Sequence, residues 1–343
     1  MSKISEIYVP TVYNVYPKKK RDYPIEPKEN LLRALRHEKP LWMPNFMAYF
    51  QDTSYIGRGE PLQDGEQFVD MWGVTQQFSS AQASATAIST AFDEVTEWRE
   101  KLVWPNISEM NLPEKFAGFK RKENRLVTGH IPTACFEQLH KLEGFEQALV
   151  DMILETQTCR ELFEAQVDFQ LEYFKEMHKI FNYEYVIYHD DWGTARGPFF
   201  SMELFKEAVL PPSIRLVKEV QKMGVPVMFH CCGLIDAFIP YLVEDIGADG
   251  LQIQKINDIK GILQKYGDIV TVEYSEPDPF IMYDKESTSE DIKNLARYVV
   301  DNFGAHVNPG AGVVVSISAP TEEIYNCFED EMYEYSLEKY SKL

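Results

Sequence analysis

The segment His230-Cys231-Cys232-Gly233 contains the residues best suited to chemistry in this chain of 343 residues. It follows the short apolar run 225–229, which is typical of a buried β-strand. Successive side chains of a strand point to opposite faces, so we expect His230 and Cys232 on the same side. An imidazole and a thiolate are ligands that zinc prefers. The pair predicts half of a zinc site; the alternative is a core histidine beside two unreactive cysteines.

Polar side chains also follow other predicted strands. They are His130, then His189 with Asp190 and Asp191, then Gln252 with Gln254, then Glu273, and finally the serines Ser316 and Ser318. Two adjacent carboxylates are costly to bury without partners or a cation, so Asp190 and Asp191 are candidates for proton transfer. Capping of loop amides is the alternative for both. For His189 the alternatives are capping or pairing with a carboxylate, and for Glu273 a salt bridge.

Short β-rich runs and helical patterns alternate from about residue 125 to the C-terminus. Strands are expected at 126–128, 185–188, 225–229, 251–253, 269–272 and 312–315, and helices at 201–223, 235–246, 259–266, 289–303 and 321–340. This order is typical of parallel βα units. A further candidate strand at 42–46 brings the count toward eight. No GxGxxG motif follows the first strand, which disfavours a dinucleotide-binding fold. We therefore predict an α/β fold, a single (β/α)8 TIM barrel, whose strands carry the chemistry at their carboxyl ends.

Composition and charge limit the possible partners. We predict one barrel domain at 28–343 after an N-terminal extension at 1–27, because no shift in composition marks another boundary. The formal charge of -20 disfavours nucleic acid and anionic membranes. No apolar run approaches the about 20 residues that span a bilayer. The N-terminus lacks a signal-peptide pattern, so we expect a cytoplasmic protein with reduced cysteines.

Five segments together resemble the uroporphyrinogen decarboxylase-like superfamily, in particular its corrinoid-dependent methyltransferase branch. They are residues 28–35 (KENLLRAL) with Pro44, 70–74 (DMWGV), 189–193 (HDDWG) with Gly197, Pro198 and Ser201, 230–233 (HCCG), and 247–249 (GAD). The resemblance implies a (β/α)8 barrel. It also implies a zinc-dependent enzyme that moves a methyl group between a small substrate, an O-methyl ether or a thiol, and the cobalamin of a separate corrinoid protein.

The resemblance implies His230 and Cys232 as zinc ligands, with a third ligand that in many members is a late cysteine. In this chain the corresponding segment, 310–320, carries serines instead. Serine is a poor zinc ligand beside a thiolate. We predict that Glu273 replaces the cysteine, with Ser316 and His306 as alternatives.

The remaining site predictions concern the proton and the substrate. His189, Asp190 and Asp191 are predicted to be catalytic, with one of the two aspartates handling the proton. Trp42, Phe46, Trp192 and Gln252 are predicted to contact the small-molecule methyl donor or acceptor, although core packing explains the aromatic residues equally well. The cobalamin-binding motif Asp-x-His-x-x-Gly is absent, so a partner corrinoid protein must supply the cobalamin.

Two other functions stay open. The first is a cofactor-free decarboxylase of the uroporphyrinogen decarboxylase type. Residues 42–50 contain none of the arginines that the decarboxylase branch uses, and acidic residues would repel a polycarboxylate. A decarboxylase of another substrate would bind no metal and would use a cationic pocket, with Arg58 or Arg196. The second is a non-catalytic barrel that binds a ligand after losing its third metal ligand.

Overall fold

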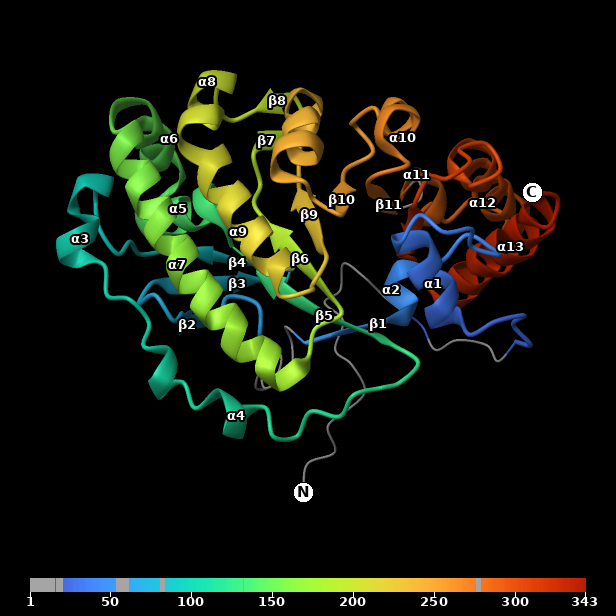
Figure 1. The fold of residues 1–343 in the computed structure, drawn as a ribbon, viewed down its shortest axis with the longest axis horizontal. Coiled ribbons are helices and arrows are strands. Elements are labelled where there is room, and N and C mark those ends of the chain that lie inside the picture. Colours follow the sequence, from blue (N-terminus) through green and yellow to red (C-terminus); the bar gives the residue numbers. More distant parts are fainter. Residues whose placement is uncertain (1–15, 17–20, 54–61, 81–83, 132, 276–278) are drawn as a thin grey trace. The chain divides into compact units, whose positions relative to one another are not determined.

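The computed structural model describes residues 16, 21–53, 62–80, 84–131, 133–275 and 279–343 (Figure 1). Contacts divide the chain into two units. The first comprises Met1–Gln51, Lys122–Leu126 and Asp249–Leu343, and the second comprises Asp52–Arg121 and Val127–Ala248. Most of the predicted N-terminal extension, and Arg58, lie outside the described residues. The prediction of one domain over 28–343 stays a prediction.

The second unit is built on three parallel strands, β5 (Leu126–Ile131), β6 (Tyr185–His189) and β9 (Val227–Cys231). Their residues are almost all buried, as expected for parallel strands that are covered on both faces. The β6–β9 register pairs His189 with His230. The two histidines therefore lie side by side at the carboxyl ends of neighbouring strands.

Helices follow each of these strands. They are α5 (Cys135–Glu143), α6 (Phe145–Leu154) and α7 (Thr156–Phe181) after β5, then α8 (Met202–Leu204), a π-helix (Phe205–Val209) and α9 (Leu210–Lys222) after β6, and a 3₁₀ turn (Asp236–Phe238) with a π-helix (Tyr241–Ile246) after β9. Helix α7 packs along α9 (Figure 1). The predicted helix at 201–223 is confirmed, but with a π-helical turn. Pro211 and Pro212 explain this turn because proline cannot donate to the carbonyl four residues earlier and clashes with it.

The rest of the second unit consists of short elements. Strands β2 (Gln67–Val69), β3 (Thr75–Ser79) and β4 (Ser84–Ala87) form an antiparallel sheet, and β7 (Gly193–Thr194) pairs with β8 (Gly197–Pro198). Two 3₁₀ turns (Val95–Glu97 and Ile107–Glu109) and the helices α3 (Trp98–Lys101) and α4 (Leu112–Lys115) connect them to β5.

The first unit also contains three parallel strands, β10 (Gly250–Ile253), β11 (Thr271–Ser275) and β12 (Val313–Ser316). Its helices are α1 (Pro27–Leu35), α2 (Phe46–Tyr49), α10 (Ile259–Tyr266), α11 (Pro279–Met282), α12 (Ser289–Phe303) and α13 (Glu322–Tyr340), and β1 (Phe50–Asp52) follows α2. The predicted strand at 42–46 is wrong. Within this segment only Asn45 makes a β-bridge, to Val315. No strand extends from it because the Asn45 side chain accepts from the backbone N of Ala48 and caps the start of α2.

The prediction of an α/β fold with parallel strands and alternating helices is confirmed. The helices predicted at 259–266 and 289–303 have those bounds, whereas β9 and β11 begin two residues after the predicted strands. The closed eight-stranded barrel stays a prediction. Within the described ranges, no helix combines the length and the apolar character needed to cross a membrane.

Candidate metal centre

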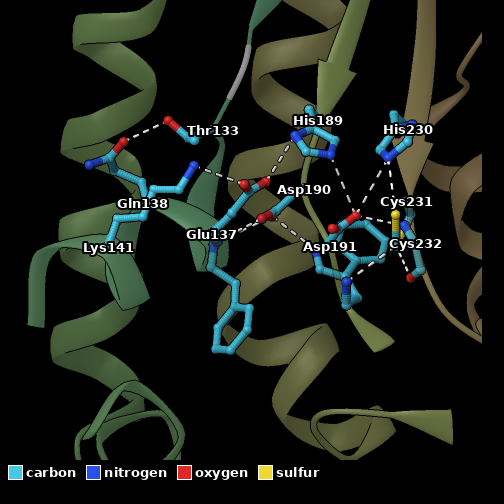
Figure 2. Close-up of polar contacts among 12 residues, drawn as sticks. Thr133, Glu137, Gln138, Lys141, His189, Asp190, Asp191, His230, Cys231 and Cys232 are labelled. Atoms are coloured by element: carbon cyan, nitrogen blue, oxygen red, sulfur yellow. Dashed lines mark hydrogen bonds and ion pairs between the residues drawn. The ribbon is translucent and has the colours of Figure 1, made fainter. Parts of the chain in front are cut away.

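Four side chains with metal-binding atoms meet at the carboxyl ends of β6 and β9 (Figure 2). His230 Nε2 lies 3.3 Å from Cys232 Sγ. Asp191 Oδ1 lies 3.6 Å from His189 Nε2 and 3.7 Å from His230 Nε2. Among the described residues, His189, Asp191 and His230 are the group whose ligand atoms lie within 4.8 Å of one another. The predicted pairing of His230 with Cys232 on one side of β9 is confirmed.

The loops after β6 and β9 hold these groups through backbone contacts. Gly233 has φ +93, and a Cβ built on it would lie 2.3 Å from the carbonyl carbon of Gly193. Only glycine allows this approach at this backbone conformation. The backbone N of Cys232 donates to Asp191 Oδ1 at 2.6 Å, which joins the two loops at the site.

Cys231 points to the other face of β9. It is fully buried, and its sulfur accepts from the backbone N of Trp192 at 3.2 Å. Burial raises the pKa of the Cys231 thiol well above its usual value. Cys231 therefore belongs to the core, while its neighbour Cys232 belongs to the site.

Glu137, in the first turn of α5, was not predicted from the sequence. Its Oε2 lies 3.0 Å from His189 Nδ1, and its Oε1 accepts from Lys141 Nζ at 3.0 Å (Figure 2). The side chain of Glu137 is only 10% exposed. A glutamate in the first helical turn after a parallel strand is a recognisable signal, but helix N-termini favour acidic residues for electrostatic reasons alone.

Asp190 joins β6 to the start of α5. Its carboxylate is fully buried and accepts from the backbone N of Glu137 at 2.8 Å, the backbone N of Phe136 at 3.4 Å and the indole N of Trp192 at 2.8 Å. Burial raises its pKa to about 7, against the effect of these hydrogen bonds. The contacts are those of the capping alternative, and the catalytic role of Asp190 stays a prediction.

Burial and charge act in opposite directions at this site. Burial lowers the pKa of His189, but contacts with Cys232 and Glu137 outweigh it and hold that pKa well above its usual value. Burial raises the pKa of Glu137, yet His189 and Lys141 bring it down to about 2. Burial raises the pKa of Asp191 and of the Cys232 thiol. Without a metal, the contacts with Glu137 and Cys232 therefore favour the protonated form of His189.

Three donor–donor distances at the site are compatible with a tetrahedral metal. Ligands at about 2.0–2.3 Å from zinc, placed at tetrahedral corners, lie about 3.3–3.8 Å apart. His230 to Cys232 at 3.3 Å, His189 to Asp191 at 3.6 Å and His230 to Asp191 at 3.7 Å fall in this range. Nitrogen, sulfur and carboxylate oxygen are also the ligand types that zinc uses.

The predicted third ligand, Glu273, lies in the first unit, on β11. Its buried carboxylate accepts hydrogen bonds from Gln252, Ser275 and Ser316. Burial raises its pKa to about 7, although these hydrogen bonds oppose the shift. Gln252 and Ser316 thus bind Glu273, and His306 Nε2 lies 3.5 Å from Asp301 Oδ1. The roles of Glu273, Ser316 and His306 as ligands, and of Gln252 in substrate binding, stay predictions.

The aromatic residues predicted to contact the substrate are buried in ring contacts. Trp42 stacks on Tyr23, and Phe46 stacks on Phe50. Trp192 is fully buried and contacts Phe229 and other rings. These are the contacts of core side chains, which was the alternative reading. Their substrate role stays a prediction.

Comparison with known proteins identifies the family. Residues 133–326 match the family described as uroporphyrinogen decarboxylase (URO-D). Because the match covers more than half of the chain, this protein belongs to the uroporphyrinogen decarboxylase family, which confirms the resemblance in its sequence. A methyltransferase from Methanosarcina mazei has a similar structure, with a TM-score of 0.64, 12% sequence identity, and coverage of 90% of this chain and 99% of that chain. At this identity the similarity shows the fold alone. No curated protein matches the chain.

Proposed function

We propose that this protein is a zinc-dependent methyltransferase that moves a methyl group between a small substrate, an O-methyl ether or a thiol, and the cobalamin of a separate corrinoid protein. The observation that carries the proposal is the group of His189, Asp191 and His230, whose ligand atoms lie within 4.8 Å of one another, with Cys232 Sγ 3.3 Å from His230 Nε2. A methyltransferase among the similar structures supports the proposal. We also propose that the chain forms a single (β/α)8 TIM barrel.

The residues divide into ligands and a proton carrier. We assign His230, Cys232 and His189 as the ligands, because catalytic zinc sites use three protein ligands and keep one position open. A bound zinc ion would supply Lewis-acid chemistry at that position, activating a substrate thiol or polarising a methyl ether. This assignment replaces Glu273 with His189, a residue of the same unit as His230 and Cys232.

We assign Asp191 as the general acid or base that gives a proton to the substrate oxygen or takes one from the substrate thiol. When a methyl group leaves an oxygen, that oxygen gains a proton, and when a thiol accepts a methyl group, the sulfur loses one. Asp191 is held beside the proposed ligands through the backbone N of Cys232. Burial raises its pKa, which brings the carboxyl group closer to the working range of a general acid or base.

Metal content tests the ligand assignment. Protein purified without chelator is expected to hold one zinc per chain, and His230→Ala, Cys232→Ala and His189→Ala are expected to lose it. Glu273→Gln is the matched control and is expected to keep the zinc. If Glu273→Gln loses zinc while His189→Ala keeps it, the sequence-based ligand set is correct and ours is wrong. Metal-free wild-type protein that still binds a small ligand would point to a decarboxylase or a binding barrel.

Methyl transfer is tested by absorption spectroscopy of cobalamin. The wild-type protein is mixed with methylcobalamin and a panel of thiols, and separately with reduced cobalamin and a panel of methoxylated aromatic compounds. We expect interconversion of the methylated and reduced forms in one of the two panels, and its loss in Cys232→Ala. No conversion in either panel, from protein with full zinc content, would contradict the proposed reaction.

A further inference from the structure

His189 has different partners at its two ring nitrogens. Nδ1 faces the carboxylate of Glu137 at 3.0 Å, and Nε2 faces Asp191 Oδ1 at 3.6 Å, on the side of His230 and Cys232 (Figure 2). A carboxylate at one nitrogen keeps the proton there and leaves the other nitrogen as the metal-binding atom. The geometry points to Glu137 as the residue that positions His189 and presents its Nε2 to the metal. This inference rests on the proposed function.

Glu137 is itself held from three directions. Its backbone N donates to the Asp190 carboxylate at 2.8 Å, so the first turn of α5 is tied to the residue that follows His189. The backbone N of Ala134 donates to the carbonyl of His189 at 3.0 Å. Lys141, one turn later on α5, donates to the carboxylate oxygen that faces away from His189. The end of β6, the start of α5 and the side chain of Glu137 are thus connected to one another.

The substitution that tests this role is Glu137→Gln, which keeps the shape of the side chain and removes its charge. We expect zinc affinity, measured by competition with a chromophoric chelator, to fall about 10- to 100-fold, as is usual for the outer partner of a metal-bound histidine. Glu137→Asp, which keeps the charge on a shorter side chain, is expected to retain part of the affinity.

A control variant separates this role from general effects of charge. Glu146→Gln removes an exposed carboxylate from the next helix and is expected to bind zinc within about threefold of wild type. In a His189→Ala background, Glu137→Gln is expected to have no further effect, because Glu137 acts through His189.

A second measurement needs no metal. In the apo-protein, the Nδ1 proton of His189 is expected as an exchange-protected, downfield resonance in proton NMR spectra, absent from Glu137→Gln and from His189→Ala but present in Glu146→Gln. If the resonance is present as expected and wild-type protein binds no zinc, the metal part of the proposed function fails while the positioning role stands. If Glu137→Gln keeps both the resonance and wild-type zinc affinity, the inference is overturned.

Discussion

At the scale of single residues, Glu143 is a buried acid outside the candidate metal centre. It ends α5, lies beside Asp151 of α6, and is 4% exposed, as is Asp151. Within the described part of the chain, no group donates a hydrogen bond to either carboxylate oxygen of Glu143. Burial, and then Asp151 and Glu94, raise its pKa to about 9. The group is therefore protonated in the folded protein at neutral pH.

This shift makes stability depend on pH. Glu143 ionises near pH 4.5 in the unfolded chain and near pH 9 in the folded protein. Its contribution is thus fully present below pH 4.5 and declines as pH rises toward 9, by at most about 1.4 kcal/mol per pH unit. We expect Glu143→Gln to flatten this decline in urea unfolding measured between pH 5 and pH 9. An unchanged slope, matching that of the control Glu146→Gln, would mean that Glu143 is ionised when folded.

The sequence was most informative where chemistry depends on neighbouring positions. The spacing of His230 and Cys232 was enough to predict that they share a face, because strand geometry alternates strictly. Glu137 lies far from both in the sequence, and its contact with His189 depends on how α5 is oriented against β6. Local patterns contain no information on that orientation, so Glu137 was not predicted.

At the scale of elements, the hydrogen bonds that connect the end of β6 to the start of α5 depend on the carboxylate of Asp190. One buried carboxylate satisfies two backbone N–H groups at a helix start and one indole N–H. We expect Asp190→Ala to lower the free energy of unfolding by about 1–3 kcal/mol, the usual effect of losing a charged cap. Asp190→Asn, which keeps an accepting oxygen, should lose less. Urea denaturation of the three proteins gives the comparison.

The same variants test the predicted catalytic role of Asp190. If Asp190→Ala unfolds at the wild-type urea concentration and holds zinc, yet transfers no methyl group, the carboxylate is catalytic rather than structural.

The helices α10 and α12 were predicted with their observed bounds because their amphipathic patterns are regular. The strand at 42–46 was wrong because a capping asparagine, Asn45, starts a helix within an otherwise apolar run.

At the scale of the whole molecule, the charge of -20 is the dominant property. Like charges repel one another across the folded surface, and salt shortens the range of this repulsion from about 30 Å at 0.01 M to about 3 Å at 1 M. We expect the melting temperature to rise when sodium chloride is raised over this range at fixed pH, as measured by differential scanning calorimetry. A fall in melting temperature would show that surface ion pairs, such as Arg215 with Asp168, outweigh the repulsion.

The alternation of Cys231 and Cys232 along β9 also determines how the centre responds to oxidants. The side chain of Cys231 is fully buried in the core, whereas that of Cys232 lies at the partly exposed candidate metal centre. A disulfide needs its two sulfurs about 2.05 Å apart, whereas the side chains of Cys231 and Cys232 point to opposite faces of the chain at the end of β9. A sulfenic acid formed by peroxide at Cys232 therefore stays open to reduction by a small thiol and does not go on to a disulfide with Cys231.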